Sequence, residues 1–390
     1  MTDIKSMTVE ELKGLMAELG EKPFRAKHIY SWLHEHLVTS YDEMENIPKS
    51  LRQKLEQYPI TVLETLDVQI SKIDGTRKYL FRLSDGNMIE SVLMKYKHGN
   101  SVCISSQAGC RMGCRFCAST IGGLTRNLLP SEMLDQIYRI QTSLGERISN
   151  VVVMGTGEPM DNYDNLLRFI HILTEEGGIH ISQRNLTVST CGLVPQIYKL
   201  ADEKLQMTLA VSLHAPNDEK RRELMPIANK YSIDELLEAC RNYFDKTGRR
   251  ITFEYSLVAG VNDSKENAKE LAGRLKGLNC HVNLIPVNPV RERSFVRSTR
   301  QAVENFKINL EKYGINGTIR REMGSDIDGA CGQLRKRYME KTESEKGHEG
   351  IFSYGCRAEA EDEPGLCVRF RNPCRKSPEF VRCCRWNGRS

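Results

Sequence analysis

The stretch SVCISSQAGCRMGCRFCA, residues 101–118, joins a short strand-forming run to three closely spaced cysteines. Its first part, SVCISS, has the length and side-chain types of a buried strand. Similar runs follow in NVVVMG (150–155) and NLTVST (185–190), and each interval leaves room for a helix. The spacing therefore predicts a strand–loop–helix unit that recurs along the chain.

Outward from this stretch, the same pattern continues toward the carboxyl end. We expect strands at 101–106, 150–155, 185–190, 206–213, 250–258 and 281–287, and helices at 131–144, 163–175, 233–246 and 266–275. A further strand at 316–320 is expected at an edge. Strands that alternate with helices favour a parallel sheet with crossover helices. The pattern predicts an α/β fold with a partial (β/α)6 barrel, and an open doubly wound sheet is the alternative.

The regions on either side of the barrel differ in pattern. Residues 1–60 carry apolar side chains at helical spacing and predict a helical accessory domain. Residues 61–98 alternate apolar and polar types, with hairpin signals at Asp74-Gly75 and Asp85-Gly86, and predict a small β linker segment. The barrel is assigned to 99–340. The tail, 341–390, lacks periodicity and holds five cysteines, and we expect an extension without a fold of its own.

The composition narrows the class of protein. The 390 residues are 39% hydrophobic and 27% charged, with a net charge of +5, as is ordinary for a globular protein. No apolar run is long enough for a membrane span, and the charged N-terminus lacks the apolar core of a secretory signal. We therefore expect a cytoplasmic protein. In that compartment, 13 cysteines indicate metal or redox chemistry rather than a disulfide framework.

The cysteines Cys110, Cys114 and Cys117 have the spacing C-x3-C-x2-C. Three thiolates from one loop can bind three irons of a [4Fe–4S] cluster and leave the fourth iron open. The open iron can chelate the amino and carboxylate groups of S-adenosylmethionine (SAM), whose cleavage gives a radical. The alternative is a zinc knuckle, which needs a second ligand pair. Cys191, Cys240 and Cys280 are isolated and offer no such pair.

Seven residues, most of them polar or glycine, lie at or just after the ends of the predicted strands. Because the carboxyl ends of barrel strands carry active sites, we expect these residues to share one face, where Glu158 could accept from the amino group of SAM. They are Gly157, Glu158, Ser189, Ser212, Leu213, His214 and Asn288. The alternative for each is an ordinary turn or capping residue.

Two other cysteines stand out. Cys103 lies in the first predicted strand, and Cys331 lies in the glycine-rich segment GSDIDGACGQL. An exposed thiolate in such a segment is a candidate nucleophile, and a small buried residue is the alternative.

These motifs together resemble a known family, the radical-SAM adenine-C2 RNA methyltransferases that act on 23S rRNA and tRNA. The resemblance extends to about Tyr338 and rests on CISSQAGCRMGCRFC, GTGEPMDNY, VSLHAPND, RRELMPI, NLIPVNP and SDIDGACGQL. It implies a partial barrel that follows an accessory domain. It also implies methylation of adenine C2, at adenine 2503 in 23S rRNA and adenine 37 in tRNA.

The resemblance also implies a role for each matching residue. Cys110, Cys114 and Cys117 match the cluster ligands, and the strand-end residues named above match SAM contacts. Cys331 matches a cysteine that becomes S-methylcysteine, Cys103 matches a second catalytic cysteine, and Glu90 matches a proton acceptor. Two SAM molecules are then consumed per product, and a transient disulfide is reset by a thiol reductant. A flavodoxin-like protein would reduce the cluster, and we expect a monomer.

Local basic clusters are the candidates for RNA contact, since the net charge is modest. They comprise Lys22, Arg25, Lys27, Arg291, Arg293, Arg297 and Arg300. The alternative for each is a solvated face. Other functions also remain open: methylation of adenine C8 by an antibiotic-resistance relative, activation of a protein substrate by the same cluster, or RNA binding without catalysis. Pro159, after Gly157 and Glu158, favours the C2 group over the C8 relative.

Overall fold

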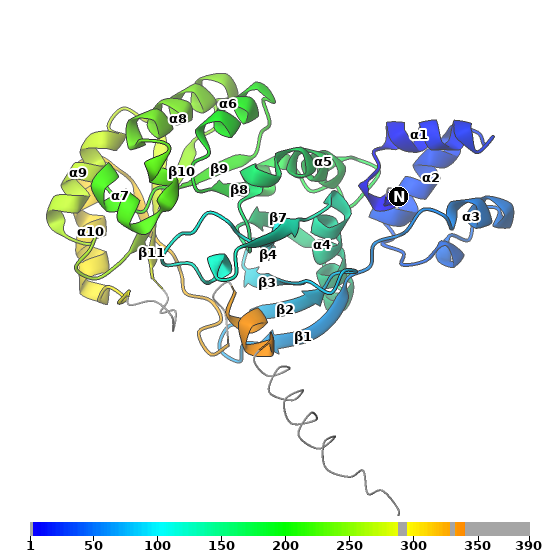
Figure 1. Ribbon diagram of the computed structural model, residues 1–390, viewed down its shortest axis with the longest axis horizontal. Coiled ribbons are helices and arrows are strands. Elements are labelled where there is room, and N and C mark those ends of the chain that lie inside the picture. Colours follow the sequence, from blue (N-terminus) through cyan, green and yellow to red (C-terminus); the bar gives the residue numbers. More distant parts are fainter. Residues whose placement is uncertain (1–2, 288–294, 328–331, 340–390) are drawn as a thin grey trace, which may run out of the picture. The chain divides into compact units, whose positions relative to one another are not determined.

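One mostly parallel sheet organises the chain (Figure 1). The computed structural model describes residues 3–287, 295–327 and 332–339. The ten strands lie in the order β1-β2-β3-β4-β7-β8-β9-β10-β11-β12. Their bounds are β1 Glu64–Ile70, β2 Arg77–Arg82, β3 Met88–Tyr96, β4 Gly99–Ile104, β7 Ile148–Val153, β8 Leu186–Thr190, β9 Thr208–Ser212, β10 Ile251–Leu257, β11 Cys280–Pro286 and β12 Gly317–Ile319.

The strands from β4 to β12 are parallel, and each crossover between them contains at least one helix. The helices are α4 Pro130–Leu144, α5 Tyr163–Thr174, α6 Val194–Asp202, α7 Asp218–Leu224, α8 Ile233–Thr247, α9 Lys265–Leu275 and α10 Arg300–Lys312. Neighbouring strands follow one another in the sequence, so the order never reverses as it does in a doubly wound sheet. The partial barrel is therefore confirmed. The predicted strands are confirmed within a few residues, whereas α6, α7 and α10 were not predicted.

The helix ends follow their capping residues. The Ser232 side chain accepts from the backbone N–H of Glu235, and Glu235 reaches back to Ser232, so α8 begins with a capping box. The same helix ends at Gly248, whose φ of +66° is the left-handed conformation that glycine adopts without strain. A helix of fixed length can then return the chain to the start of β10.

The strands β1, β2 and β3 continue the same sheet in antiparallel fashion. The predicted turn signals are confirmed, because Gly75 and Gly86 lie between these strands with φ of +73° and +83°. In the pairing of β3 with β4, Val92 lies opposite Cys103. The β segment therefore shares a hydrogen-bonded edge with the first strand of the barrel.

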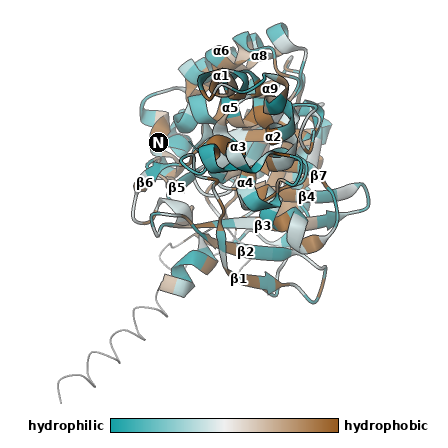
Figure 2. Ribbon diagram, turned by 90° about the vertical axis from the view of Figure 1, so that its right-hand side faces the viewer, coloured by the Kyte–Doolittle hydropathy of each residue, from teal (hydrophilic) through white to brown (hydrophobic). Residues whose placement is uncertain are grey.

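The N-terminal helices α1 (Val9–Glu18), α2 (Phe24–His34) and α3 (Lys49–Leu55) lie beside α4 and α5 (Figures 1 and 2). The Tyr30 hydroxyl donates to the carbonyl of Ile172 at 3.1 Å. The His34 Nδ1 atom lies 2.8 Å from the Tyr138 hydroxyl, and both side chains are fully buried. Buried polar contacts thus join α2 to the barrel helices.

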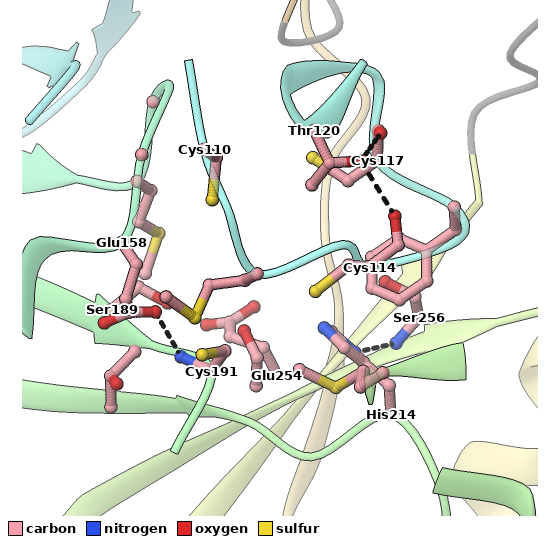
Figure 3. A pocket seen from close by; sticks show the side chains of 18 of the residues that line it. Cys110, Cys114, Cys117, Thr120, Glu158, Ser189, Cys191, His214, Glu254 and Ser256 are labelled. Atoms are coloured by element: carbon pink, nitrogen blue, oxygen red, sulfur yellow. Dashed lines mark hydrogen bonds between the residues drawn. The ribbon is translucent and has the colours of Figure 1, made fainter. Parts of the chain in front are cut away.

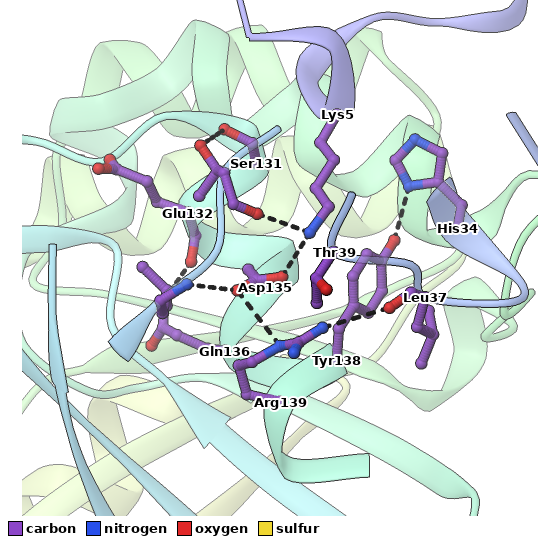
Figure 4. Close-up of polar contacts among 12 residues, drawn as sticks. Lys5, His34, Leu37, Thr39, Ser131, Glu132, Asp135, Gln136, Tyr138 and Arg139 are labelled. Atoms are coloured by element: carbon purple, nitrogen blue, oxygen red, sulfur yellow. Dashed lines mark hydrogen bonds and ion pairs between the residues drawn. The ribbon is translucent and has the colours of Figure 1, made fainter. Parts of the chain in front are cut away.

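A buried ion pair completes this attachment (Figure 4). Lys5, in a short 3-10 helix at Ile4–Ser6, places its Nζ 2.7 Å from the Asp135 carboxylate of α4, and neither side chain is exposed. The same ammonium donates to the Thr61 carbonyl, and the second Asp135 oxygen accepts from Leu63 N–H at 2.7 Å. Asp135 therefore holds both ends of residues 3–63 against the barrel.

None of the helices in the described part of the chain is long and apolar enough to span a membrane. The predicted tail, 341–390, lies outside the described residues.

The Lys5–Asp135 pair gives a prediction for stability. Asp135→Asn leaves the Lys5 charge buried without its counter-charge, so we expect the free energy of unfolding to fall by about 3–5 kcal/mol. Lys13→Gln is the control, because it removes a surface ion pair with Glu10 that contributes about 0–1 kcal/mol. Urea denaturation of both variants measures the difference, and equal losses would contradict the prediction.

Candidate functional site

A cavity of about 280 Å³ opens at the carboxyl ends of the parallel strands (Figure 3). Its walls come from the loop after β5, from the segment after β7 and from the ends of β8, β9, β10 and β11. The polar and sulfur-bearing lining residues include Cys110, Cys114, Cys117, Glu158, Ser189, Cys191, Ser212, His214, Glu254, Ser256 and Arg320. The structure thus brings together, in one cavity, most of the site residues that the sequence predicted.

The three motif cysteines lie on a loop that is closed by a small antiparallel ribbon of β5 (Gln107–Gly109) and β6 (Leu124–Asn127). The Cys110 N–H donates to the Gly123 carbonyl at 2.9 Å. Gly109 has a φ of +81°, and a Cβ there would lie 2.1 Å from the Gly123 oxygen. Only glycine permits this close approach, which closes the base of the cysteine loop.

Two of the three thiols, Cys110 and Cys114, are poorly placed to ionise on their own. Burial raises the pKa of the Cys110 thiol to about 12 and also raises the pKa of Cys114. Thiolates here need a strong positive centre, which a metal cluster provides. Among the described residues, no three ligand-type side chains converge as around a single metal ion. An iron–sulfur cube binds each thiolate at a different corner, so three separated thiols that face one cavity fit such a cluster.

The glycine turn after β7 passes close to the chain that leads into the cysteine loop. Gly157 has a φ of +112°, and a Cβ there would lie 2.6 Å from Gln107 Cβ and 2.8 Å from Gln107 N. At Gly155 a Cβ would lie 2.7 Å from the Ile104 carbonyl oxygen. Both glycines are therefore required for this packing, and the turn forms one wall of the cavity.

Glu158 is a buried acceptor at this wall. Its carboxylate accepts from Cys191 N–H at 2.7 Å and from Met160 N–H at 3.0 Å. Burial raises the pKa of Glu158, and these hydrogen bonds oppose that rise. Figure 3 shows the Glu158 carboxylate beside Ser189 and Cys191. An acceptor at this position suits the ammonium group of an amino acid.

His214 is held in one tautomer. The backbone N–H of Ser256 donates to His214 Nδ1 at 2.9 Å, so Nδ1 carries no proton. Burial lowers the pKa of His214 to about 3, which makes the ring neutral. The Nε2 atom therefore carries the hydrogen. Phe116, from the cysteine loop, packs edge-on against the ring with centroids 4.8 Å apart.

The remaining predicted residues have different positions. Ser189 and Ser212 line the cavity, whereas the Leu213 side chain is fully buried in the core and is not among the lining residues. Cys103 is buried in β4, and Glu90 is buried in β3. Neither of the two lines the cavity. Asn288 and Cys331 lie outside the described residues.

Three residues at the cavity or near it were not predicted from the sequence. They are Glu254 and Ser256, which line the cavity from β10, and the buried Arg221 of α7. Glu254 and Ser256 are two residues apart in an apolar strand, and that alternation is the signal that both face the barrel interior. The fully buried Arg221 donates to the Cys191 carbonyl at 2.7 Å. Its Nε and Nη1 atoms have no hydrogen-bond partner among the described residues.

Two of the predicted RNA-contact residues form ion pairs with acidic side chains, and three others are exposed. Arg25 pairs with Glu21 at 3.2 Å, and Arg297 pairs through both terminal nitrogens with Glu322. Lys22, Lys27 and Arg300 are exposed. Arg291 and Arg293 lie outside the described residues.

Comparison with known proteins shows the family of this chain. The model of the radical SAM superfamily matches residues 104–272, and that of the ribosomal RNA large subunit methyltransferase N-terminal domain matches residues 2–60. A protein of Lachnospira eligens named "Probable dual-specificity RNA methyltransferase RlmN" is 65% identical over 89% of this chain and 99% of its own length. A protein of the same name from Lachnoclostridium phytofermentans is 62% identical over 87% of this chain and 96% of its own.

A solved structure gives the same result for the fold. The crystal structure of a radical SAM methyltransferase from Sphaerobacter thermophilus superimposes with a TM-score of 0.82 at 45% identity, and the match covers 85% of this chain and 99% of that one. With this fold, the three-cysteine loop over the strand ends and relatives of such identity over nearly their whole length, the chain belongs to the RlmN family of radical SAM dual-specificity RNA methyltransferases.

Proposed function

We propose that this enzyme methylates C2 of an adenine in 23S rRNA and in tRNA, through an S-methylcysteine intermediate. The observation that carries the proposal is the 65% identity to a dual-specificity RNA methyltransferase over almost all of that protein. The geometry supports it, because three cysteine thiols and the strand-end polar groups share one cavity.

Cys110, Cys114 and Cys117 would hold a [4Fe–4S] cluster, which supplies the electron for cleavage of SAM when it is bound. Glu158 offers a buried acceptor for the SAM ammonium group, and Gly157 lets the backbone approach the ligand. Ser189, Ser212 and the Nε2–H of His214 offer further polar contacts at the strand ends. Backbone groups of Leu213 and residue Asn288 complete the proposed SAM site.

Cys331 and Cys103, which lie outside the cluster loop, would make it possible to methylate the unreactive carbon C2 of adenine. Adenine C2 has no useful lone pair, and no protein base can generate a carbanion there. A methyl group carried on Cys331 would be activated as a radical and join C2, which links RNA and protein covalently. Glu90 would accept the C2 proton, and a one-electron acceptor would remove the unpaired electron that remains. The Cys103 thiolate would then attack the Cys331 sulfur to form a disulfide, and the electron pair of the broken S–C bond would stay on the carbon, which is protonated to the product methyl group. An external thiol reductant would restore both thiols.

The base must leave its stack to reach a cavity at the strand ends, so the substrate would present the adenine in a loop or an unstacked region. Lys22, Lys27 and Arg300 are exposed and could contact the RNA backbone. We expect a cytoplasmic monomer that receives electrons from a flavodoxin-like protein.

Analysis of the modified base tests the proposal. The full chain, reconstituted anaerobically and incubated with SAM, a reductant and 23S rRNA or tRNA, should give 2-methyladenosine in nuclease digests analysed by mass spectrometry. Detection of 8-methyladenosine would instead identify the C8 relative. No methylated base would favour a protein substrate or RNA binding without catalysis.

The two catalytic cysteines should fail in different ways. We expect Cys331→Ala to abolish methylation, because the methyl carrier is lost, and Cys103→Ala to accumulate a covalent protein–RNA adduct, because the resolving thiol is lost. Denaturing gel electrophoresis with labelled RNA detects the adduct. Cys280→Ala is the control, since Cys280 is buried in β11 and does not line the cavity. Turnover by either catalytic variant at the wild-type rate would refute the mechanism.

The glycine turn gives a prediction for SAM binding. Gly157→Ala places a Cβ against Gln107 in a left-handed backbone, so the turn must move, and SAM should bind at least about tenfold more weakly. Gly248→Ala is the matched control, because it also has a positive φ but nothing lies within 4 Å of the new Cβ. Equilibrium dialysis with radiolabelled SAM compares the two. Equal affinity would show that the turn does not contact SAM.

A further inference from the structure

The Glu90 carboxylate is engaged by three donors from two distant parts of the chain. Lys78 Nζ lies 2.9 Å from Glu90 Oε2, and both side chains are buried. The backbone N–H of Gly332 donates to the same oxygen at 2.6 Å, and the N–H of Arg335 donates to Oε1 at 2.6 Å. Gly332 directly follows Cys331, and residues 333–339 are helical. Glu90 therefore holds the start of the segment that follows the methyl-carrying cysteine.

The sheet register places Cys103 beside this group. Val92 of β3 lies opposite Lys78 of β2 and also opposite Cys103 of β4. Glu90 is two residues from Val92, so its side chain lies on the same face of the sheet. Lys78, Arg320 and Glu90 all influence the Cys103 thiol electrostatically. Cys103 and Glu90, which have catalytic roles in the proposed mechanism, thus share one face of the sheet with the buried Lys78, which has no role in it.

We propose that Lys78 is a positioning residue: it fixes the Glu90 carboxylate, and Glu90 in turn fixes the segment after Cys331. A buried carboxylate without a counter-charge is strongly unfavourable, and the Lys78 ammonium supplies that charge. The carboxylate can then serve as an acceptor for Gly332 and Arg335. In this way the Lys78–Glu90 pair fixes the backbone that directly follows Cys331.

The Glu90 carboxylate is also the proposed acceptor of the C2 proton. When the C2–H bond breaks, its electron pair stays in the ring, and its proton binds to the carboxylate that Lys78, Gly332 and Arg335 contact. This step rests on the proposed function.

Proton uptake by Glu90 weakens its contacts with the segment that it holds. A neutral carboxyl group is a weaker acceptor than a carboxylate, because the hydrogen bonds lose their charge assistance. The hydrogen bonds from Gly332 and Arg335 therefore weaken once the C2 proton has been taken up, which is the stage before the proposed disulfide forms.

Hydrogen exchange in the full-length protein tests the positioning role without requiring activity. Lys78→Met and Glu90→Gln remove the charge from either partner, so the amides of Gly332 and Arg335 should exchange about tenfold faster than in the wild type. Lys78→Arg retains the charge and should restore slow exchange. Lys95→Met is the control, because Lys95 lies on the same strand as Glu90 in an exposed pair with Glu146. If Lys78→Met does not fold, the isosteric Glu90→Gln decides the outcome.

An isotope experiment separates positioning from a merely structural role. With deuterium at C2 of the target adenine, Lys78→Met should show a larger isotope effect on kcat, a kcat about tenfold lower and a nearly unchanged KM for RNA. Lys78→Arg should restore both kcat and the isotope effect. A protein that is only less folded would show a lower rate with the same isotope effect, and that result would overturn the proposal.

Unchanged exchange at residues 332–335 in folded Lys78→Met and Glu90→Gln would equally overturn it. Failure of the proposed function is distinguishable from these results. In that case the wild type would form no 2-methyladenosine, while the exchange measurement would still decide whether the Lys78–Glu90 pair holds the segment.

Discussion

The cysteine loop and the glycine turn depend on one stretch of parallel pairing, in which Ile104 of β4 lies opposite Val153 of β7. Beyond the last paired residues the two chains stay in contact, because Gly155 N–H donates to the Ile104 carbonyl at 2.9 Å. Further on, Gly157 packs directly against the backbone of Gln107. The three cysteines of the loop and the proposed SAM contacts are therefore held in a fixed relation by backbone rather than by flexible side chains.

The cavity and its surroundings hold several buried ionisable groups. Glu158 and Glu254 are acids whose pKa is raised by burial, and Arg221 is fully buried among carbonyls and thiols. The Lys78–Glu90 pair lies within the same sheet. Such groups are costly in a protein interior, so their concentration here is typical of a site whose chemistry needs fixed charges.

The sequence predicted the barrel well because its information is local. Apolar runs such as NVVVMG and turn pairs such as Asp85-Gly86 specify strands and hairpins without help from distant residues. The short α7 was missed because Leu224 is its only apolar residue. By contrast, α6 and α10 carry buried apolar residues at helical spacing, so the same pattern could have predicted them. The ribbon of β5 and β6 was missed for another reason: it forms because Gly109 and Gly123 approach each other across the cysteine loop, which no periodicity reveals.

In the candidate site too, some features could be predicted from the sequence and others only from the folded chain. Ser189 and Ser212 lie at the ends of predicted strands and His214 directly follows one, and parallel pairing brings the ends of those strands together. The tautomer of His214 depends on a backbone N–H from a different strand, and only the folded chain shows it. Lys78 gave no signal in the sequence, because its proposed role depends on Glu90, which in turn accepts from Gly332, 242 residues further along the chain.

The antiparallel strands β1–β3 limit where the chain can be shortened or exchanged with a relative. They extend the barrel sheet without a break, and β3 is hydrogen-bonded along β4, the strand that leads into the cysteine loop. A shortened protein that begins at β4 would lose the partner of an interior strand and expose a long, apolar edge to solvent. Exchange of N-terminal segments between relatives would therefore best be made before Glu64, where only helices are transferred and the sheet remains whole.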